Sequence, residues 1–318
     1  MLSKKNKELL KKQHYSIAGK HSAVQICRWT KKSLVDEGFC YKQKFYGIKS
    51  HRCAEISPSA VWCQNKCLHC WRSIENTQGD EIPKNVDTPD KIIKECVMGR
   101  NKLLSGFGGN EKLNKKKFKE AQDPDQFAIS LIGEPTLYPY LCEMINMLRK
   151  EKKTSFVVTN GLNPHVLSKM QKNKCLPTQL YISLNTPNKK LYDKWHRSSK
   201  KDAWKVFNES LDLMRKLKTR TVIRMTLVKD LNMNEDMVED YASLIKKADP
   251  MFVEVKGYMS VGYARKRLGY EKMPNWNEVQ RYAKLIAKAI GYKILDGHEH
   301  SRVVLLGKNK KDMKIKKV

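Results

Sequence analysis

The sequence predicts an α/β protein in which parallel strands form a full or partial barrel. Three observations support this fold class. Short β-rich runs alternate with amphipathic stretches along most of the chain, and Pro, Asn, Asp or Gly bounds most of the amphipathic stretches. This spacing is typical of βαβ units, whose strands lie parallel. The length of 318 residues suits one large core.

Six strands and six helices are expected in alternation. The strands are 127–132, 155–159, 179–184, 221–228, 252–256 and 303–306, and the helices are 89–104, 140–150, 164–171, 201–217, 234–247 and 276–290. Active sites of such barrels lie at the carboxyl ends of the strands. The Gly- and Lys-rich segment 106–122 is expected to be a mobile insertion, and the Lys-rich ends 1–14 and 308–318 are expected to be frayed arms.

Charge indicates a polyanionic partner. Lys and Arg number 63 against 33 Asp and Glu, a net charge of +30 that exceeds what solubility requires. We favour nucleic acid as this partner. The alternative is a Lys-rich solvated surface, as in heat-adapted proteins. No apolar run of about 18 residues and no signal core are present, so we expect a cytoplasmic protein without a membrane segment. Structural disulfides are not expected among nine cysteines in a reducing compartment.

One group of cysteines has the spacing of a metal site. Cys63, Cys67 and Cys70 form a CxxxCxxC pattern, which supplies three thiolates for three irons of a cubane and leaves the fourth iron open. Structural zinc prefers four closed ligands, so a zinc site would have to recruit His69 or a distant cysteine. The pattern therefore favours an iron–sulfur cluster.

This group, with His69 before its last cysteine and Trp71 after it, resembles the radical-SAM superfamily signature. The resemblance implies a partial (β/α)6 TIM-like barrel and a 4Fe-4S cluster whose open iron chelates S-adenosylmethionine (SAM), which is cleaved to a 5′-deoxyadenosyl radical. Later segments resemble the cofactor-holding positions of the family, where glycine shapes a turn and hydroxyl or amide groups bind ribose and carboxylate. These positions are Gly133, Glu134, Pro135, Thr136, Thr159, Asn160, Ser183 and Asn185.

A second group of three cysteines lies upstream. Cys27, Cys40 and Cys53 are separated by 12 residues each time, and they supply three further thiolates for a second cluster with an open iron. Three buried free cysteines are the alternative. Lys42 lies two residues from Cys40, and a lysine near a buried site can lose its proton and condense with a carbonyl.

Both cysteine groups, together with the runs CYKQKFYG and GEPTLYP, resemble the archaeal tRNA 4-demethylwyosine synthases of the wyosine-biosynthesis radical-SAM family. The resemblance implies a carbon–carbon lyase with two 4Fe-4S clusters that condenses pyruvate with N1-methylguanosine at position 37 of the tRNA(Phe) anticodon loop. Lys42, rather than Lys44, would be catalytic, holding pyruvate as a Schiff base or closing the ring by transimination. An external electron donor is required, since there is no room before Cys27 for a flavodoxin-like domain.

The expected organisation has three parts in a monomer. Residues 1–57 form an N-terminal extension with the second-cluster ligands, residues 58–290 the core barrel and residues 291–318 a basic C-terminal segment. Cations and aromatics in or after the later strands are expected to form an RNA-binding rim. The rim residues are Arg224, Lys229, Lys256, Tyr258, Tyr263, Arg265, Lys266 and Arg267.

Two other functions fit parts of the pattern. Another radical-SAM RNA modifier, a methylthiotransferase or a methyltransferase, would not depend on pyruvate. A zinc-stabilised RNA-binding protein would contain zinc, no labile sulfide and no SAM-cleaving activity.

Overall fold

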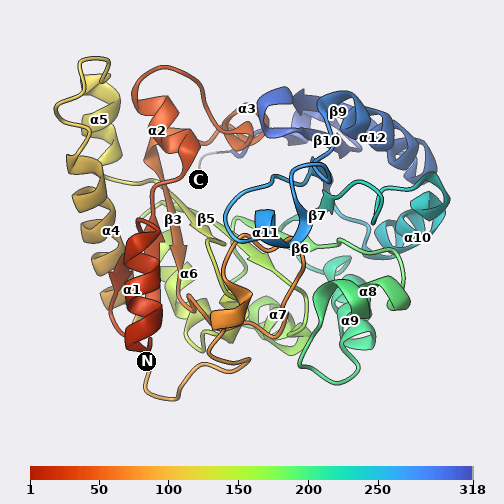
Figure 1. Cartoon of the computed structure of the whole chain (residues 1–318), viewed down its shortest axis with the longest axis horizontal. Helices are drawn as coiled ribbons and strands as arrows, with labels where there is room; N and C mark the ends of the chain where they lie inside the picture. The colour runs from red at the N-terminus through yellow and green to blue at the C-terminus, as the bar shows by residue number, and fades with distance from the viewer. Residues whose placement is uncertain (317–318) are drawn as a thin grey trace.

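The chain folds around one ten-stranded sheet, seen in a computed structural model that describes residues 1–316 (Figure 1). The strand order is β1-β2-β3-β4-β5-β6-β7-β8-β10-β9. The strands are β1 (Ser16–Ala18), β2 (Ser22–Gln25), β3 (Cys53–Ser57), β4 (Gln126–Ile129), β5 (Thr154–Thr159), β6 (Gln179–Ser183), β7 (Arg220–Leu227), β8 (Phe252–Gly257), β9 (Lys293–His298) and β10 (Val303–Gly307).

The six central strands make the barrel. Strands β3 to β8 are parallel neighbours, whereas β1, β2, β9 and β10 extend the two edges in antiparallel pairs. Because the edge strands β1 and β9 do not pair with each other, the barrel is partial, as the resemblance implied. The carboxyl ends of β3 to β8 therefore meet at one edge, where a site can be built.

Helices cover the outer face of the sheet, and their apolar sides share its largest core cluster. None of the helices in residues 1–316 is long and apolar enough to cross a membrane. The helices are α1 (Lys4–Lys12), α2 (Arg28–Leu34), α3 (Tyr41–Tyr46), α4 (Pro89–Ser105), α5 (Lys115–Ala121), α6 (Leu141–Lys150), α7 (Pro164–Lys172), α8 (Lys189–His196), α9 (Ala203–Met214), α10 (Val238–Ala248), α11 (Ala264–Leu268) and α12 (Trp276–Ile290).

All six expected strands and all six expected helices are confirmed, with ends that differ by a few residues. Three expectations about loose segments are wrong. Within residues 308–316 the tail is held to the core, since Met313 is buried in one cluster with Ile315, whose amide donates to the Tyr46 carbonyl at 3.0 Å. The first arm contains α1 and is held by the buried side chains of Leu2, Leu10 and Tyr15, which pack in one cluster with Trp62. Segment 106–122 contains α5, where Phe118 and Ala121 pack against α2 and α4 residues, so it is not a free insertion. Residues 317–318 lie outside the described residues.

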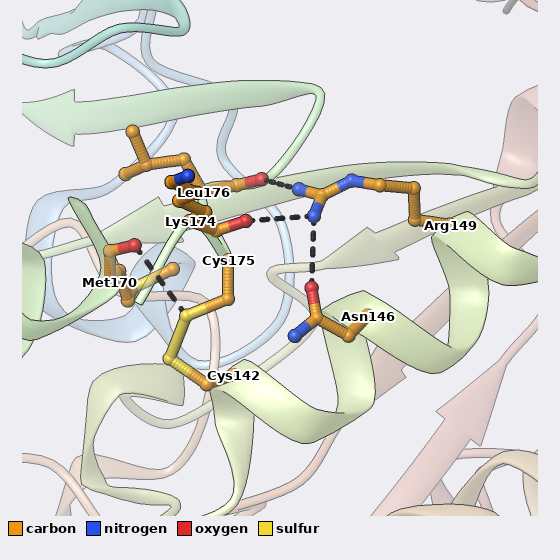
Figure 2. The surroundings of a disulfide bond; sticks show 7 residues. All are labelled: Cys142, Asn146, Arg149, Met170, Lys174, Cys175 and Leu176. Carbon is orange, nitrogen blue, oxygen red and sulfur yellow. Dashed lines mark hydrogen bonds between the residues drawn. A yellow bond between two sulfur atoms is a disulfide. The ribbon is translucent and has the colours of Figure 1, made fainter. Parts of the chain in front are cut away.

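A disulfide also contradicts the sequence-based expectation. Cys142 at the start of α6 bonds to Cys175 after α7, with Cα atoms 5.2 Å apart, a separation that suits a disulfide (Figure 2). The guanidinium of Arg149 donates hydrogen bonds to the carbonyls of Lys174 and Leu176 at the same junction. The covalent bond and these hydrogen bonds fasten the α7–β6 loop to α6. The remaining seven cysteines are free.

Candidate active site

The first triad, Cys63, Cys67 and Cys70, lies in the loop that follows β3. Its sulfurs contact residues from later barrel loops: Cys67 Sγ lies 3.0 Å from His196 Nδ1, and Asn160 Nδ2 lies 3.8 Å from Cys63 Sγ. Trp195 Nε1 donates to His69 Nδ1 over 2.8 Å, which fixes the ring that precedes Cys70. The loop is therefore held against the strand ends of the barrel.

The three thiols lie close enough to influence one another. Burial raises the pKa of Cys67 well above its ordinary value, and the charges of Cys63 and Cys70 raise it further. Arg72 lies against the same loop, where its Nη2 donates to the Asn65 carbonyl at 3.1 Å. Burial lowers the pKa of Arg72, but the charges of Cys63 and Cys70 outweigh burial and raise it. Its Nη1 is buried without a hydrogen-bond partner among the described residues. A converging thiolate set beside an unsatisfied cation fits an anionic iron–sulfur cluster.

Arg267 clamps this loop from almost 200 residues away in sequence. Its Nε donates to the Leu68 carbonyl over 3.1 Å, its Nη2 donates to the Cys70 carbonyl, and its Nη1 pairs with Glu75 at 3.2 Å. The Leu68 and Cys70 carbonyls lie in a loop and have no partner in a helix or strand, so Arg267 supplies the hydrogen bonds that they need. Arg267 thus positions the loop, a role that the sequence did not indicate.

Glu134 joins two of the expected SAM-binding segments. Its buried carboxylate accepts hydrogen bonds from Thr136 Oγ1 at 2.6 Å, Thr159 Oγ1 at 2.7 Å and the Asn160 amide at 2.7 Å. Burial raises the pKa of Glu134, while these bonds lower it. Pro135 begins a 3-10 turn beside it. Glu134, Thr136, Thr159 and Asn160 therefore form one network at the ends of β4 and β5.

Gly133 makes the close approach of this network possible. Its φ is +72°, and a Cβ there would lie 1.9 Å from the Ser59 carbonyl oxygen. We expect Gly133→Ala to lower the free energy of unfolding by more than about 1 kcal/mol and to weaken SAM binding, because both the backbone and the carbonyl would have to move. Urea unfolding and calorimetric titration of the reconstituted protein with SAM measure the two effects.

The matched control is Gly109→Ala, because a Cβ at Gly109 would meet nothing within 4 Å. This variant should unfold and bind SAM as the parent does. Equal behaviour of the two alanine variants would contradict the role assigned to Gly133.

Ser183 ends β6 and Asn185 follows it, but the two residues differ in what they contact. Asn185 is buried, and its Oδ1 accepts the Thr226 amide hydrogen at 3.0 Å, which ties it to β7. Ser183, half-buried, pairs in register with Arg224 on β7. The geometry gives Asn185 a structural contact, and its side chain is less available to a cofactor than that of Ser183.

The second triad, Cys27, Cys40 and Cys53, converges from three elements. Cys27 and Cys40 are the N-cap residues of α2 and α3, and Cys53 begins β3. Burial raises the pKa of Cys27 to about 12, and the charge of Cys40 raises it too. Burial likewise raises the pKa of Cys53, with contributions from Cys27 and Cys40. The contacts of Ser50, three residues before Cys53, bring the triad together: its carbonyl accepts from Thr30 Oγ1, which lies 3.4 Å from Cys27 Sγ, and its hydroxyl accepts from the Cys40 amide at 2.9 Å.

Lys42 is buried and points into the barrel. Its Nζ lies 5.5 Å from the ring centroid of Phe156 and 5.6 Å from that of Tyr181, on β5 and β6, and its backbone amide contacts Cys40 Sγ at 3.5 Å. Lys44 instead pairs with Asp296 at 2.8 Å on the surface. The geometry thus separates two lysines that the sequence alone could not.

A buried network holds α3 over the barrel. Glu254 on β8 accepts hydrogen bonds from Tyr41 at 2.9 Å and Tyr46 at 2.8 Å and pairs with Arg224 Nε at 3.0 Å. The side chain of Glu254 is fully buried. Lys256 lies on the same strand, and burial and the charge of Arg224 lower its pKa to about 8. Glu254 therefore fixes the helix that carries Lys42.

Replacing Glu254 should destabilise the fold strongly. We expect Glu254→Ala to lower the free energy of unfolding by about 3–5 kcal/mol, because it leaves Arg224 buried without its partner. Glu235→Ala is the control, since its ion pair with Arg281 is exposed and such pairs contribute about 0–1 kcal/mol. Urea titration measures both, and similar losses would contradict the buried network.

The structure places only some of the expected RNA-binding rim residues at the surface. Arg224 and Arg267 are committed to Glu254 and to the first-triad loop, and Tyr258 is buried. Lys229 pairs with Glu278, Lys256 donates to the Ser301 carbonyl and Arg265 to the Ser260 carbonyl. Tyr263 and Lys266 line a cavity. A Lys or Arg that is paired within the fold cannot be told from an exposed one by residue type, so the sequence could not distinguish the two.

In residues 1–316, no group of three or more His, Cys, Asp or Glu has the arrangement of a single-ion site. The thiolates of a cubane cluster bind different iron atoms, so the lack of a single-ion arrangement does not bear on a cluster held by three cysteines.

The partial barrel and the first-triad loop define the class of protein. Residues 57–244 match the family model of the radical SAM superfamily, and residues 247–308 match a model described as wyosine base formation. The chain is a radical SAM enzyme, which implies SAM and one 4Fe-4S cluster.

Named relatives narrow the class. The chain is 48% identical over 300 residues to the SAM-dependent tRNA 4-demethylwyosine synthase of Pyrococcus horikoshii, covering 94% of this chain and 87% of that one. It is 39% identical to the enzyme of that name from Methanocaldococcus jannaschii, with 94% of both chains covered. The chain belongs to the SAM-dependent tRNA 4-demethylwyosine synthase family, and it is an enzyme that forms the wyosine base on tRNA.

Solved structures agree with this family. A TYW1 structure with a lysine-pyruvate adduct bound superposes with a TM-score of 0.86 at 38% identity and covers 99% of this chain and 98% of that one. An archaeal TYW1 crystal structure gives 0.80 at 35% identity, covering 99% and 100%. The resemblance extends over both triads and the whole barrel.

Proposed function

We propose that this enzyme condenses pyruvate with N1-methylguanosine at position 37 of tRNA(Phe) to form 4-demethylwyosine, with Lys42 as the pyruvate-binding residue. The observation that carries the proposal is the burial of the Lys42 side chain within the barrel, on the same helix as Cys40. A related protein holds a lysine-pyruvate adduct, which supports the same chemistry here.

The two triads have different proposed roles. The first holds the SAM cluster with Gly133, Glu134, Pro135, Thr136, Thr159, Asn160 and Ser183 near the cofactor. A reduced cluster held there would supply the electron for cleavage of SAM into methionine and the 5′-deoxyadenosyl radical, which would take a hydrogen atom from the N1-methyl group. The second triad holds a second 4Fe-4S cluster. Both triads would face the inside of the same barrel. The N1-methyl group of the substrate would therefore lie between the two clusters, within reach of both.

The residues around Lys42 suit a Schiff base. The aromatic faces of Phe156 and Tyr181 border its amine and exclude water from one side, and Lys256 and Arg224 provide positive charge nearby. The amine of Lys42 would attack the keto carbon of pyruvate to give a carbinolamine, and loss of the former carbonyl oxygen as water would leave pyruvate bound to the lysine nitrogen through a C=N bond.

The remaining partners are part of the proposal. An external electron donor reduces the SAM cluster, and the enzyme acts as a cytoplasmic monomer. Residues 1–57 carry the second-cluster ligands, although Cys53 lies in the first parallel strand of the barrel. Residues 58–290 form the catalytic core, and 291–318 form the basic terminal segment whose strands β9 and β10 complete the sheet.

The test is anaerobic incubation of the reconstituted protein with N1-methylguanosine-containing tRNA, SAM and dithionite, with and without pyruvate. Mass analysis of the digested nucleosides should find the tricyclic base only when pyruvate is present. A methylthio or methyl product without pyruvate would identify another radical-SAM modifier. Bound zinc without labile sulfide would instead identify a zinc-stabilised RNA-binding protein.

A further inference from the structure

A cavity of about 370 Å³ opens between the N-terminal strands and the segment around α11. Three parts of the chain form its walls. The lining residues are Gln13, Tyr15, Gln25, Trp71, Val261, Gly262, Tyr263 and Lys266.

The lining residues include neighbours in sequence of both triads. Gln25 is two residues before Cys27, and Trp71 directly follows Cys70. Tyr15 lies on the same wall, and burial together with the charges of Glu55 and Cys70 raises its pKa. A group held here is thus next to the loop of the first triad and to the strand that leads into the second.

Its walls have the chemistry of a nucleobase site. Trp71 is 38% exposed, an unusual state for a large aromatic side chain, and Tyr263 provides a second ring with Lys266 Nζ 5.6 Å from its centroid. Gln25 Nε2 donates to the Gln13 carbonyl at 2.8 Å, and its Oε1 has no hydrogen-bond donor among the described residues. Unstacked RNA bases bind by stacking on aromatic rings and by hydrogen bonds to their edges.

The backbone segments that carry the two rings are fixed relative to each other. The Tyr263 amide donates to the Trp71 carbonyl at 2.9 Å. Gly262 has φ +55°, and a Cβ there would lie 2.4 Å from the same carbonyl oxygen, so only glycine permits this approach. The walls are therefore preorganised, which reduces the entropic cost of binding.

We infer that this cavity, the base pocket, holds the methylated purine of the substrate RNA, stacked on Trp71 with Tyr263 and Lys266 at its rim and Gln25 at its edge. This inference rests on the proposed function, which requires one methyl group to reach both triads. The site combines residues between positions 13 and 71 with residues between positions 261 and 266.

The test compares Trp71→Ala with Trp71→Phe and with Tyr270→Ala, whose side chain is 68% exposed and does not line the cavity. Equilibrium binding of the N1-methylguanosine anticodon stem-loop to reconstituted protein, without reductant, gives Kd independently of turnover. Trp71→Ala should weaken binding by about 5- to 100-fold, the range for loss of one stacked base. Trp71→Phe should largely restore it, and Tyr270→Ala should leave it unchanged.

Iron and sulfide content separates a binding defect from a damaged cluster loop. If Trp71→Ala loses iron, Gln25→Ala takes its place, with an expected severalfold loss of affinity for the loss of one hydrogen bond. Unchanged Kd in a variant with full iron content, while wild-type enzyme makes the tricyclic base, would overturn the base pocket and leave the proposed function intact. Absence of the tricyclic base from wild-type reactions would instead overturn the proposed function.

Discussion

Replacing Lys42 with methionine should abolish formation of the tricyclic base while 5′-deoxyadenosine still accumulates. The rate of product formation should fall by at least about a thousandfold, because the variant has no amine to hold the keto carbon of pyruvate. Methionine retains much of the apolar stem that packs near Phe156 and Tyr181, so folding should be preserved. Chromatography of nucleosides and of 5′-deoxyadenosine from the same reaction measures both outcomes.

Lys44→Met is the matched control. Lys44 lies on the same short helix, but its amine pairs with Asp296 at the surface, so this variant should retain activity. Product formation by Lys42→Met at the parental rate would show that the amine is not the pyruvate carrier.

Replacing Cys27, Cys40 and Cys53 together with alanine should separate SAM cleavage from base formation. Iron content should fall from about eight to about four atoms per chain, since one of two four-iron clusters is lost. The first triad is untouched, so reduced protein should still cleave SAM. Iron analysis, electron paramagnetic resonance of the reduced protein and product analysis follow the three effects.

Cys96→Ala provides the comparison, because Cys96 is a buried free cysteine that belongs to neither triad. It should keep the full iron content and form product. If the triple variant also kept about eight iron atoms, the second cluster would have to be assigned to other ligands.

Periodicity predicted the barrel because its strands are buried on both faces. Runs such as those of β4 and β6 are nearly continuous in buried residues, and amphipathic helices follow them. Two strands at one edge, β1 and β2, were missed for a physical reason. β1 and β2 have three and four residues, too few to establish an alternation, and their neighbour α1 hides Leu10 among lysines.

The site was predicted where local spacing sets it and missed where tertiary contacts do. Cysteine spacing located both triads, whereas the roles of Arg267 and Glu254 depend on partners about 200 residues away. The Cys142–Cys175 disulfide likewise joins residues 33 apart whose proximity comes from the packing of α6 and α7. Residue spacing did not distinguish Lys42 from Lys44, and the choice came from the family resemblance. The orientation of α3 supplies the physical reason, because it turns Lys42 into the barrel and Lys44 to the surface.

The central claim is that pyruvate is held on Lys42 between the triads, and trapping that bond tests it most directly. Reconstituted protein is incubated with ¹³C-labelled pyruvate, reduced with cyanoborohydride and digested, and the peptides are analysed by mass spectrometry. The account predicts one labelled adduct on the peptide that contains Lys42, absent from Lys42→Met. An adduct on Lys256 or Lys44 instead, or no adduct in an enzyme that makes product, would contradict it.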